Sequence, residues 1–400
     1  MPSITLKPGR ERSLLRRHPW IFSGAILRTD AGILPGSTVD VLSSLGEYLA
    51  RAAYSPQSQI CARVWTFADE PIDADLFRRR IRSAVHARHL LHVEASTDAF
   101  RLVYAESDHV PGLIADRYGE TLVVQFLTAG TAYWGQTLAD LLSEETGLSC
   151  IYERSDSDVR DLEGLPAQTG WLRGQGAKAA PTDLRLEIAE HGLKSVVDIA
   201  QGHKTGFYLD QRENRRRVRE LSQGREVLDC FCYTGAFMVS ALAGGARSVL
   251  AVDSSGEALR LAAQNLSLNG IDSAAADLME GDVFQVLRRL RDQGRSFDMV
   301  ILDPPKFAPT AAYADKAARG YKDINLLALK LLRPDGILVT FSCSGGIDAA
   351  LFQKIVAAAA LDAGAEAQIV EHLGQAPDHP VAMEFPEGTY LKGLVILKVS

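Results

Sequence analysis

The sequence predicts an α/β protein in which a small β-barrel and a small α+β domain precede a larger domain built on a parallel sheet. Three patterns lead to this fold class. Short β runs fill the N-terminal stretch, mixed strand and helix patterns follow, and from about residue 191 continuous apolar strands alternate with helical segments. A chain of 400 residues also exceeds the usual size of one hydrophobic core. We therefore expect domains over residues 1–72, 73–190 and 191–400.

The N-terminal part has the pattern of a small barrel, because turn residues separate its β runs. These runs are Trp20–Phe22, Thr38–Val41, Tyr48–Arg51 and Ala62–Trp65. The formal net charge of the chain is -7, which by itself would discourage binding to a polyanion. Basic residues nevertheless gather before the first of these runs, with only Glu11 opposing them. We expect four of them to contact nucleic-acid phosphates: Arg10, Arg12, Arg16 and Arg17.

The middle part begins with a predicted helix over residues 75–92, which carries apolar residues at helical spacing. Its other face holds Arg78, Arg79, Arg80, Arg82 and Arg88, and both a solvated helix face and a nucleic-acid contact would explain them. Alternating strands follow at Leu122–Phe126 and Cys150–Glu153, with a helix between them at Trp134–Glu145. The Gly, Pro and Ala content of residues 164–181 predicts a loop.

The C-terminal part contains four predicted strands with continuous apolar runs, as in a parallel sheet covered on both faces. They are Glu226–Asp229, Ser248–Asp253, Met299–Asp303 and Gly336–Phe341. Three of them end in aspartate, at Asp229, Asp253 and Asp303. Ligands of open α/β sheets bind beyond the carboxyl ends of the strands, so three acids at these ends indicate a shared ligand.

The nature of that ligand follows from the loops after the strands. The loop from Asp229 to Phe237 has one glycine, Gly235, where a dinucleotide-binding loop has three, and no phosphate-binding G-K-[ST] follows. Asp253 closes the second strand, where a carboxylate can hold both hydroxyls of a ribose. Asp282 could accept from an adenine amino group beside Phe284, although a helix N-cap would also explain it. The site therefore predicts a nucleoside cofactor rather than a dinucleotide.

The order D-x-F-x-x-T-G, V-D, G-D-V-F and D-P-P-K-F resembles class I S-adenosylmethionine-dependent methyltransferases of RNA. More narrowly, the chain is similar to bacterial 23S rRNA cytosine-C5 methyltransferases of the RlmI type. The resemblance covers nearly the whole chain and is carried by the stretches at residues 10–25, 203–212, 319–325, 341–345 and 387–393.

This resemblance has several implications. The N-terminal barrel would be an RNA-binding PUA domain, S-adenosyl-L-methionine the cofactor, and 23S rRNA or a large-subunit assembly intermediate the partner. It would also place four residues near the methionine end of the cofactor: Tyr208, Asp210, Gln211 and Arg212. Phe231, in the loop after the first strand, is expected to contact the cofactor as well.

Methylation of cytosine at C5 requires a nucleophile that first attacks C6, and a thiolate is suited to this. Cys343 follows the fourth strand beside Asp303, which could hold the edge of the base. Cys230 and Cys232 are rivals, but a thiol in the cofactor loop is more typical of a small packed side chain. An inert, buried Cys343 is the other interpretation. The base that removes the C5 proton is left open among Asp303, Lys306, His379 and a water.

The remaining features exclude several classes of protein. Five scattered cysteines predict free thiols without a disulfide framework or a metal site. No apolar run approaches the roughly 20 residues of a membrane helix, so a cytoplasmic protein is expected. A homodimer is left open. Three other functions are also considered: methylation of a guanine or adenine nitrogen, a non-catalytic RNA-binding assembly factor, and methylation of a small molecule.

Overall fold

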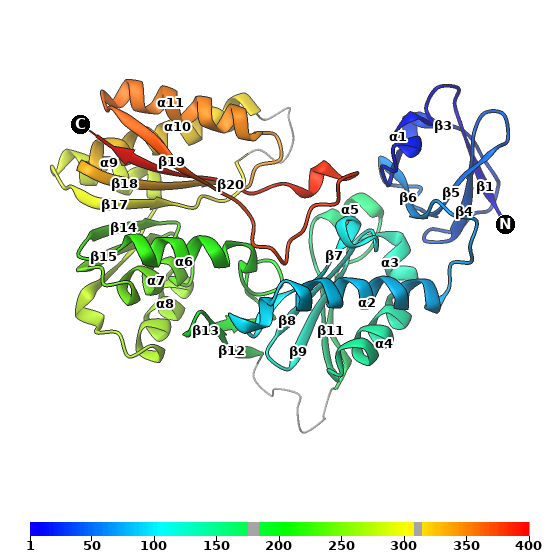
Figure 1. The fold of residues 1–400 in the computed structure, drawn as a ribbon, viewed down its shortest axis with the longest axis horizontal. Coiled ribbons are helices and arrows are strands. Elements are labelled where there is room, and N and C mark those ends of the chain that lie inside the picture. The colour runs from blue at the N-terminus through cyan, green and yellow to red at the C-terminus, as the bar shows by residue number, and fades with distance from the viewer. Residues whose placement is uncertain (175–183, 308–313, 400) are drawn as a thin grey trace. The chain divides into compact units, whose positions relative to one another are not determined.

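The computed structural model of the protein describes residues 1–174, 184–307 and 314–399. Its contacts divide the chain into two compact units (Figure 1). The first unit consists of Met1–Ala189, Val197–Leu209 and Pro377–Gly388, and the second of Glu190–Val196, Asp210–Ala376 and Thr389–Ser400. Two short segments that fall inside the predicted third domain therefore belong to the first unit. The predicted domain boundaries remain predictions.

The N-terminal domain is a six-stranded sheet in the order β2-β6-β5-β4-β1-β3. The strands are β1 (Ser3–Leu6), β2 (Trp20–Phe22), β3 (Ile26–Thr29), β4 (Thr38–Leu42), β5 (Tyr48–Tyr54) and β6 (Ile60–Thr66), with the short helix α1 (Arg12–Leu15) after β1. All four predicted β runs lie within these strands. Residues of β4 alternate between buried and half-buried, and Val39 and Val41 enter the core of this domain with Ile4 and Leu6.

Helix α2 (Ala74–Leu90) connects this domain to a second, five-stranded sheet. It begins where the Asp73 side chain accepts a hydrogen bond of 3.0 Å from the backbone N–H of Leu76, and it buries Phe77 and Ile81. The sheet has the order β11-β10-β9-β8-β7. Its elements are β7 (Ala99–Tyr104), β8 (Leu113–Tyr118), β9 (Thr121–Phe126), α3 (Ala129–Tyr133), α4 (Gly135–Thr146), β10 (Cys150–Ser155), α5 (Val159–Glu163) and β11 (Gln168–Arg173). Helices α2 and α4 pack against each other over this sheet (Figure 1).

The predicted loop over residues 164–181 is wrong for its central part, because Gln168–Arg173 forms β11. This strand pairs antiparallel with β10, and the Trp171 ring packs edge-on against Tyr152 with the ring centroids 5.2 Å apart. Glycines on both sides hid a strand whose hydrogen-bond partner and aromatic contact are supplied by a distant segment. Residues 175–181 of the predicted loop lie outside the described residues.

The second unit is built on a seven-stranded sheet in the order β16-β15-β14-β17-β18-β20-β19. Its strands are β14 (Glu226–Cys230), β15 (Ser248–Asp253), β16 (Ala276–Glu280), β17 (Phe297–Leu302), β18 (Leu332–Ser342), β19 (Ala367–Leu373) and β20 (Lys392–Lys398). The first five strands in this order are parallel, and β20 runs antiparallel to both of its neighbours. A hairpin of β12 (Arg185–Glu190) and β13 (Leu193–Asp198) precedes this sheet.

Helices cover both faces of this sheet, as the apolar strands predict (Figure 1). On one face α9 (Val283–Asp292), α10 (Ala314–Leu331) and α11 (Ala349–Ala363) enclose one apolar core. On the other, α6 (Arg212–Leu221), α7 (Ala236–Ala243) and α8 (Gly256–Leu268) enclose a second. No helix among the described residues is long and apolar enough to cross a membrane.

Candidate active site

The three predicted acids meet at one edge of the seven-stranded sheet, because β15, β14 and β17 are parallel neighbours. Cys230 pairs with Val252 on one side and with Leu302 on the other, so Asp253 and Asp303 each follow the paired residues by one position. Asp229 lies one residue before Cys230. The adjacency that the sequence predicted for these acids is confirmed by the register of the strands.

Asp229 is the most unusual of the three acids. Its side chain is fully buried, and neither carboxylate oxygen has a hydrogen-bond partner of good geometry among the described residues. Burial, followed by the nearby charge of Asp303, holds the pKa of Asp229 well above its ordinary value, and the nearby backbone of Met238 offsets this only in part. A buried carboxyl costs free energy unless a donor satisfies it, so this edge of the sheet is prepared for a ligand that donates hydrogen bonds.

The loop that follows β14 is held in an unusual conformation. Phe231, Tyr233 and Gly235 all have positive φ, with values of 61°, 49° and 76°. A Cβ atom at Gly235 would lie 2.6 Å from the Met238 Cε atom and 2.9 Å from the Ala262 Cβ atom, so only glycine fits there. Strained backbone of this kind clusters at ligand sites, and no sequence pattern had indicated it at Phe231 or Tyr233.

Asp253, at the end of β15, holds this loop in place. Its two carboxylate oxygens accept hydrogen bonds from the backbone N–H groups of Tyr233, at 2.8 Å, and Ser255, at 2.9 Å. Each oxygen keeps acceptor capacity for a further donor, such as a ribose hydroxyl. The side chain therefore has a structural task that the sequence did not reveal.

The other predicted cofactor residues have different surroundings. Asp282 caps α9, because its side chain accepts a hydrogen bond of 3.0 Å from the backbone N–H of Gln285; this is the helix-cap alternative. The ring of Phe284 packs against that of Phe307, with the ring centroids 5.8 Å apart. Gln211 is buried and accepts a hydrogen bond from the Asn214 side chain. Tyr208 belongs to the first unit, so its predicted place beside the cofactor stays a prediction.

Cys343 directly follows β18, the neighbour of β17 in the sheet. Its Sγ atom lies 4.0 Å from the carbonyl oxygen of Pro304, the residue after Asp303, and its side chain is half-buried. Cys230 and Cys232 are buried, and burial raises the pKa of both thiols well above the ordinary value. None of the five cysteines forms a disulfide, as predicted. Cys343 is therefore the most accessible thiol of the chain.

A hydrogen-bond network holds the loop that carries Cys343. Ser344 Oγ accepts from the backbone N–H of Phe307 at 3.1 Å and lies 2.9 Å from the Tyr321 hydroxyl. From the other side, Lys392 Nζ donates to the backbone carbonyls of Ser344 and Tyr390, each at 2.8 Å. Lys392 was not among the site residues predicted from the sequence, although a lysine at the start of a largely apolar strand was a signal for it.

The candidates for the proton-removing base belong to different units of the chain. Asp303 and Lys306 lie in the second unit with Cys343, and Lys306 is exposed. His379 belongs to the first unit, where it is buried beside Asp378.

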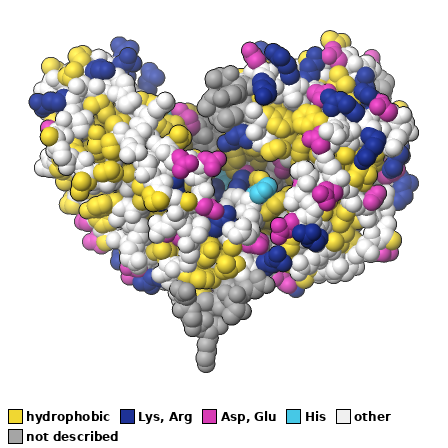
Figure 2. Space-filling model, turned by 180° about the vertical axis from the view of Figure 1, so that it is seen from behind, with side chains coloured by type: hydrophobic (Ala, Val, Ile, Leu, Met, Phe, Trp, Pro, Cys, Tyr) yellow, Lys and Arg dark blue, Asp and Glu magenta, His cyan; other side chains and the backbone are white. Residues whose placement is uncertain are grey.

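The two basic patches that the sequence singled out differ in their partners. Arg10, Arg12, Arg16 and Arg17 are all exposed, and within the described part of the chain none of them forms an ion pair. Figure 2 shows Lys and Arg side chains gathered at one end of the N-terminal domain. Arg10 and Arg12 also line a hollow of about 570 Å³ together with Trp20 and the exposed ring of Phe22.

On α2, by contrast, four of the five arginines are paired with carboxylates: Arg78 with Glu144, Arg79 with Glu70, Arg82 with Glu145 and Arg88 with Asp108. Arg88 is buried, and its guanidinium also donates to the backbone carbonyls of Arg101 and Asp378. These contacts favour the structural interpretation of this helix face over the nucleic-acid one.

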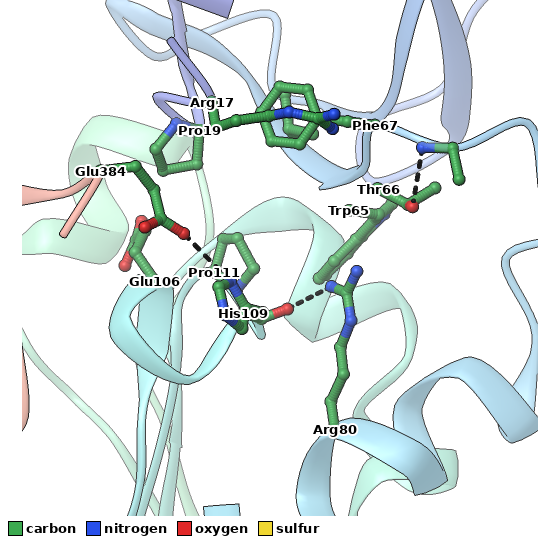
Figure 3. A pocket seen from close by; sticks show the side chains of 12 residues that line it. Arg17, Pro19, Trp65, Thr66, Phe67, Arg80, Glu106, His109, Pro111 and Glu384 are labelled. Atoms are coloured by element: carbon green, nitrogen blue, oxygen red, sulfur yellow. Dashed lines mark hydrogen bonds and ion pairs between the residues drawn. The ribbon is translucent and has the colours of Figure 1, made fainter. Parts of the chain in front are cut away.

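Arg80 is the exception on α2. It donates to the backbone carbonyl of His109, and burial lowers its pKa to about 10. Together with Arg17, whose guanidinium lies 4.9 Å from the centre of the Phe67 ring, it lines a pocket of about 240 Å³ (Figure 3). The pocket also contains Glu106 and Glu384, so both signs of charge face it.

Comparison with known proteins identifies the family. A family model for S-adenosylmethionine-dependent methyltransferases matches residues 167–395, and a model for PUA-like domains matches residues 4–67. The protein named ribosomal RNA large subunit methyltransferase I of Shewanella amazonensis is 52% identical over 393 residues, which cover 98% of each chain. Its namesake in Yersinia pseudotuberculosis is 51% identical over 391 residues, again 98% of each chain.

Solved structures show the same fold. A putative SAM-dependent methyltransferase from Streptococcus mutans superposes with a TM-score of 0.85 at 21% identity and covers 99% of this chain and 100% of its own. A putative methyltransferase complexed with SAH superposes with a TM-score of 0.84 at 22% identity, with the same coverage. The buried acid, the strained glycine loop and the strand-end carboxylates lie at the carboxyl edge of the parallel sheet in this fold. The chain belongs to the S-adenosylmethionine-dependent methyltransferases, in the family whose curated members are named ribosomal RNA large subunit methyltransferase I.

Proposed function

We propose that the protein methylates C5 of a cytosine in large-subunit ribosomal RNA, and that Cys343 is the nucleophile. The observation that carries this proposal is the half-buried thiol of Cys343 beside the Asp303-Pro304-Pro305 loop, at the same sheet edge as the cofactor acids. The names of the relatives that match the full chain support ribosomal RNA as the substrate.

S-adenosylmethionine supplies the methyl group, and the residues at the sheet edge fit it. Asp253 would hold the ribose hydroxyls, and the close approach that Gly235 permits would accommodate the cofactor backbone. Asp229 offers two buried acceptors to a donor on the cofactor. Asp282, Phe231, Gln211 and Tyr208 are proposed as the further contacts.

The chemistry assigned to the protein begins at C6 of the cytosine. The Cys343 thiolate forms a bond to C6, and the electron pair of the C5–C6 double bond moves to C5, which takes the methyl group. A base then removes the C5 proton, the electron pair of that C–H bond restores the double bond, and the thiolate leaves with its own electron pair. Asp303 would hold the base edge at N3 or N4 and stabilise the adduct.

The N-terminal domain would supply the RNA contacts. Exposed arginines without carboxylate partners are free to neutralise phosphates, and an exposed aromatic ring beside them, as at Phe22, can stack on an unpaired base. The paired arginines of α2 are poor candidates, because each would have to give up a carboxylate first.

Covalent trapping tests the proposal. RNA transcribed with 5-fluorocytidine cannot lose a proton from C5 after methyl transfer, so the wild-type protein should form a complex that resists denaturants. Cys343→Ala should bind the cofactor normally and form no complex, whereas the matched controls Cys230→Ala and Cys232→Ala should retain trapping. A wild-type protein that methylates ordinary RNA but is never trapped would contradict covalent catalysis. Methylation of a guanine or adenine nitrogen, which the Asp303-Pro304-Pro305 loop also suits, would then take its place.

A further inference from the structure

Lys392 is a half-buried lysine whose ammonium group is bonded to the loop that carries Cys343. It is the first residue of β20 and pairs in register with Ser342, the residue before Cys343. Its Nζ atom donates to the carbonyl of Ser344, the residue after Cys343, and to that of Tyr390. Hydrogen bonding and strand register therefore fix a cation on the loop that carries the thiol.

The ammonium group of Lys392 is half-buried and has ionisable neighbours. Burial lowers the pKa of Lys392 to about 8, and its neighbours act on it in both directions. Cys343 and Asp348 raise the pKa, while Lys306 lowers it. The interaction with Cys343 is reciprocal, because a thiolate that favours the ammonium form must itself be favoured by the ammonium group. Asp348 is exposed and already accepts a hydrogen bond from the Leu351 backbone at the start of α11.

Two backbone carbonyls are weak compensation for a half-buried positive charge. Lysine keeps such a position at a cost in desolvation that an uncharged residue would avoid. A negative charge that develops nearby during the reaction would offset that cost, and the thiolate of Cys343 carries such a charge.

We infer that Lys392 is a positioning residue that stabilises the thiolate form of Cys343 and so prepares it for attack. The inference rests on the proposed role of Cys343 as the nucleophile. It goes beyond that role by naming the group that makes the thiol reactive.

The test measures the reactivity of Cys343 itself. Wild-type protein and Lys392→Met are alkylated with iodoacetamide between about pH 6 and pH 9, and the modified peptides are quantified by mass spectrometry. An opposite charge within about 4–6 Å typically shifts a pKa by about one unit or more, so Cys343 of Lys392→Met should react about tenfold more slowly at neutral pH. Lys392→Arg keeps the charge and should stay near the wild-type rate.

The same strand offers a matched control. Lys398 is also half-buried at the other end of β20, and its ammonium group likewise donates to two backbone carbonyls, those of Leu329 and Leu332. Burial lowers its pKa as well. Lys398→Met should leave the alkylation of Cys343 unchanged. If Lys392→Met does not fold, Lys392→Gln takes its place with the same expectation.

The outcomes separate this inference from the proposed function. The role of Lys392 is overturned if an uncharged Lys392 variant folds and binds the cofactor, but its Cys343 is alkylated with the same pH dependence as in the wild type. An equal slowing by Lys398→Met also overturns it, because this would indicate general loosening of the strand. If Lys392→Met slows the alkylation of Cys343 but fluorinated RNA never traps the wild-type protein, the electrostatic coupling stands and the proposed role of Cys343 as the nucleophile is rejected.

Discussion

Replacing Asp253 with alanine should weaken cofactor binding more than it weakens the fold. A carboxylate that accepts from two ribose hydroxyls contributes charge-assisted hydrogen bonds worth about 2–4 kcal/mol in total, and their removal corresponds to roughly 30- to 1,000-fold in Kd. The substitution also frees the backbone N–H groups of Tyr233 and Ser255, which are now bonded at 2.8 and 2.9 Å. Because these donors can reach water, we expect a further decrease of about 1–2 kcal/mol in the free energy of unfolding.

Isothermal titration calorimetry with S-adenosylmethionine and urea unfolding measure the two effects separately. Asp272→Ala is the control, because Asp272 also accepts from a backbone N–H, that of Ala274 at 2.9 Å, but lies before β16 at the amino ends of the strands. It should lower stability slightly and leave the cofactor affinity unchanged. If Asp253→Ala lowers stability but binds the cofactor as tightly as the wild type, the carboxylate serves only the loop and the ribose assignment is wrong.

Three further predictions follow from the site and the basic patches. Because burial raises the pKa of Asp229, the cofactor-free wild type loses stability as pH rises above the ordinary carboxyl range. Asp229→Asn should therefore unfold at a higher urea concentration than the wild type at neutral pH. This difference in stability should shrink as pH falls toward about 4. A gain that does not depend on pH would contradict the raised pKa. Reversing the charges of Arg12 and Arg16 should reduce the salt dependence of RNA binding by about 0.7–0.9 log units for each phosphate that is no longer neutralised. Reversing the charges of Arg78 and Arg82 should leave this salt dependence unchanged. Salt titrations of the RNA affinity measure both. Arg88→Met removes the buried arginine and leaves the half-buried Asp108 without its ion-pair partner, so it should cost about 3–5 kcal/mol in the free energy of unfolding with little change in the RNA salt slope. A mild decrease in stability would mean that the pair contributes little.

Much of the fold could be predicted from local sequence patterns. Strands β14 and β15 were predicted nearly to the residue, and β17 and β18 were predicted in part, because an apolar strand covered on both faces leaves a continuous run of apolar side chains. The acids at their ends and the position of Cys343 followed from the same runs. Element β11 was missed because its stability comes from pairing with β10 and from the contact of Trp171 with Tyr152.

The sequence by itself determined the residue types and their order along the chain: the acids at the strand ends, the thiol after β18 and the arginines near the N-terminus. Only the tertiary structure decided which charges are partnered. Arg82 meets Glu145 across 63 positions of sequence, while Arg12 and Arg16 have no carboxylate partner among the described residues. Likewise, the antiparallel pairing of β20 with β18 places Lys392 opposite Ser342, the residue before Cys343. Local propensity cannot encode such pairs, because the energy of a charge depends on the burial and partners that distant segments provide.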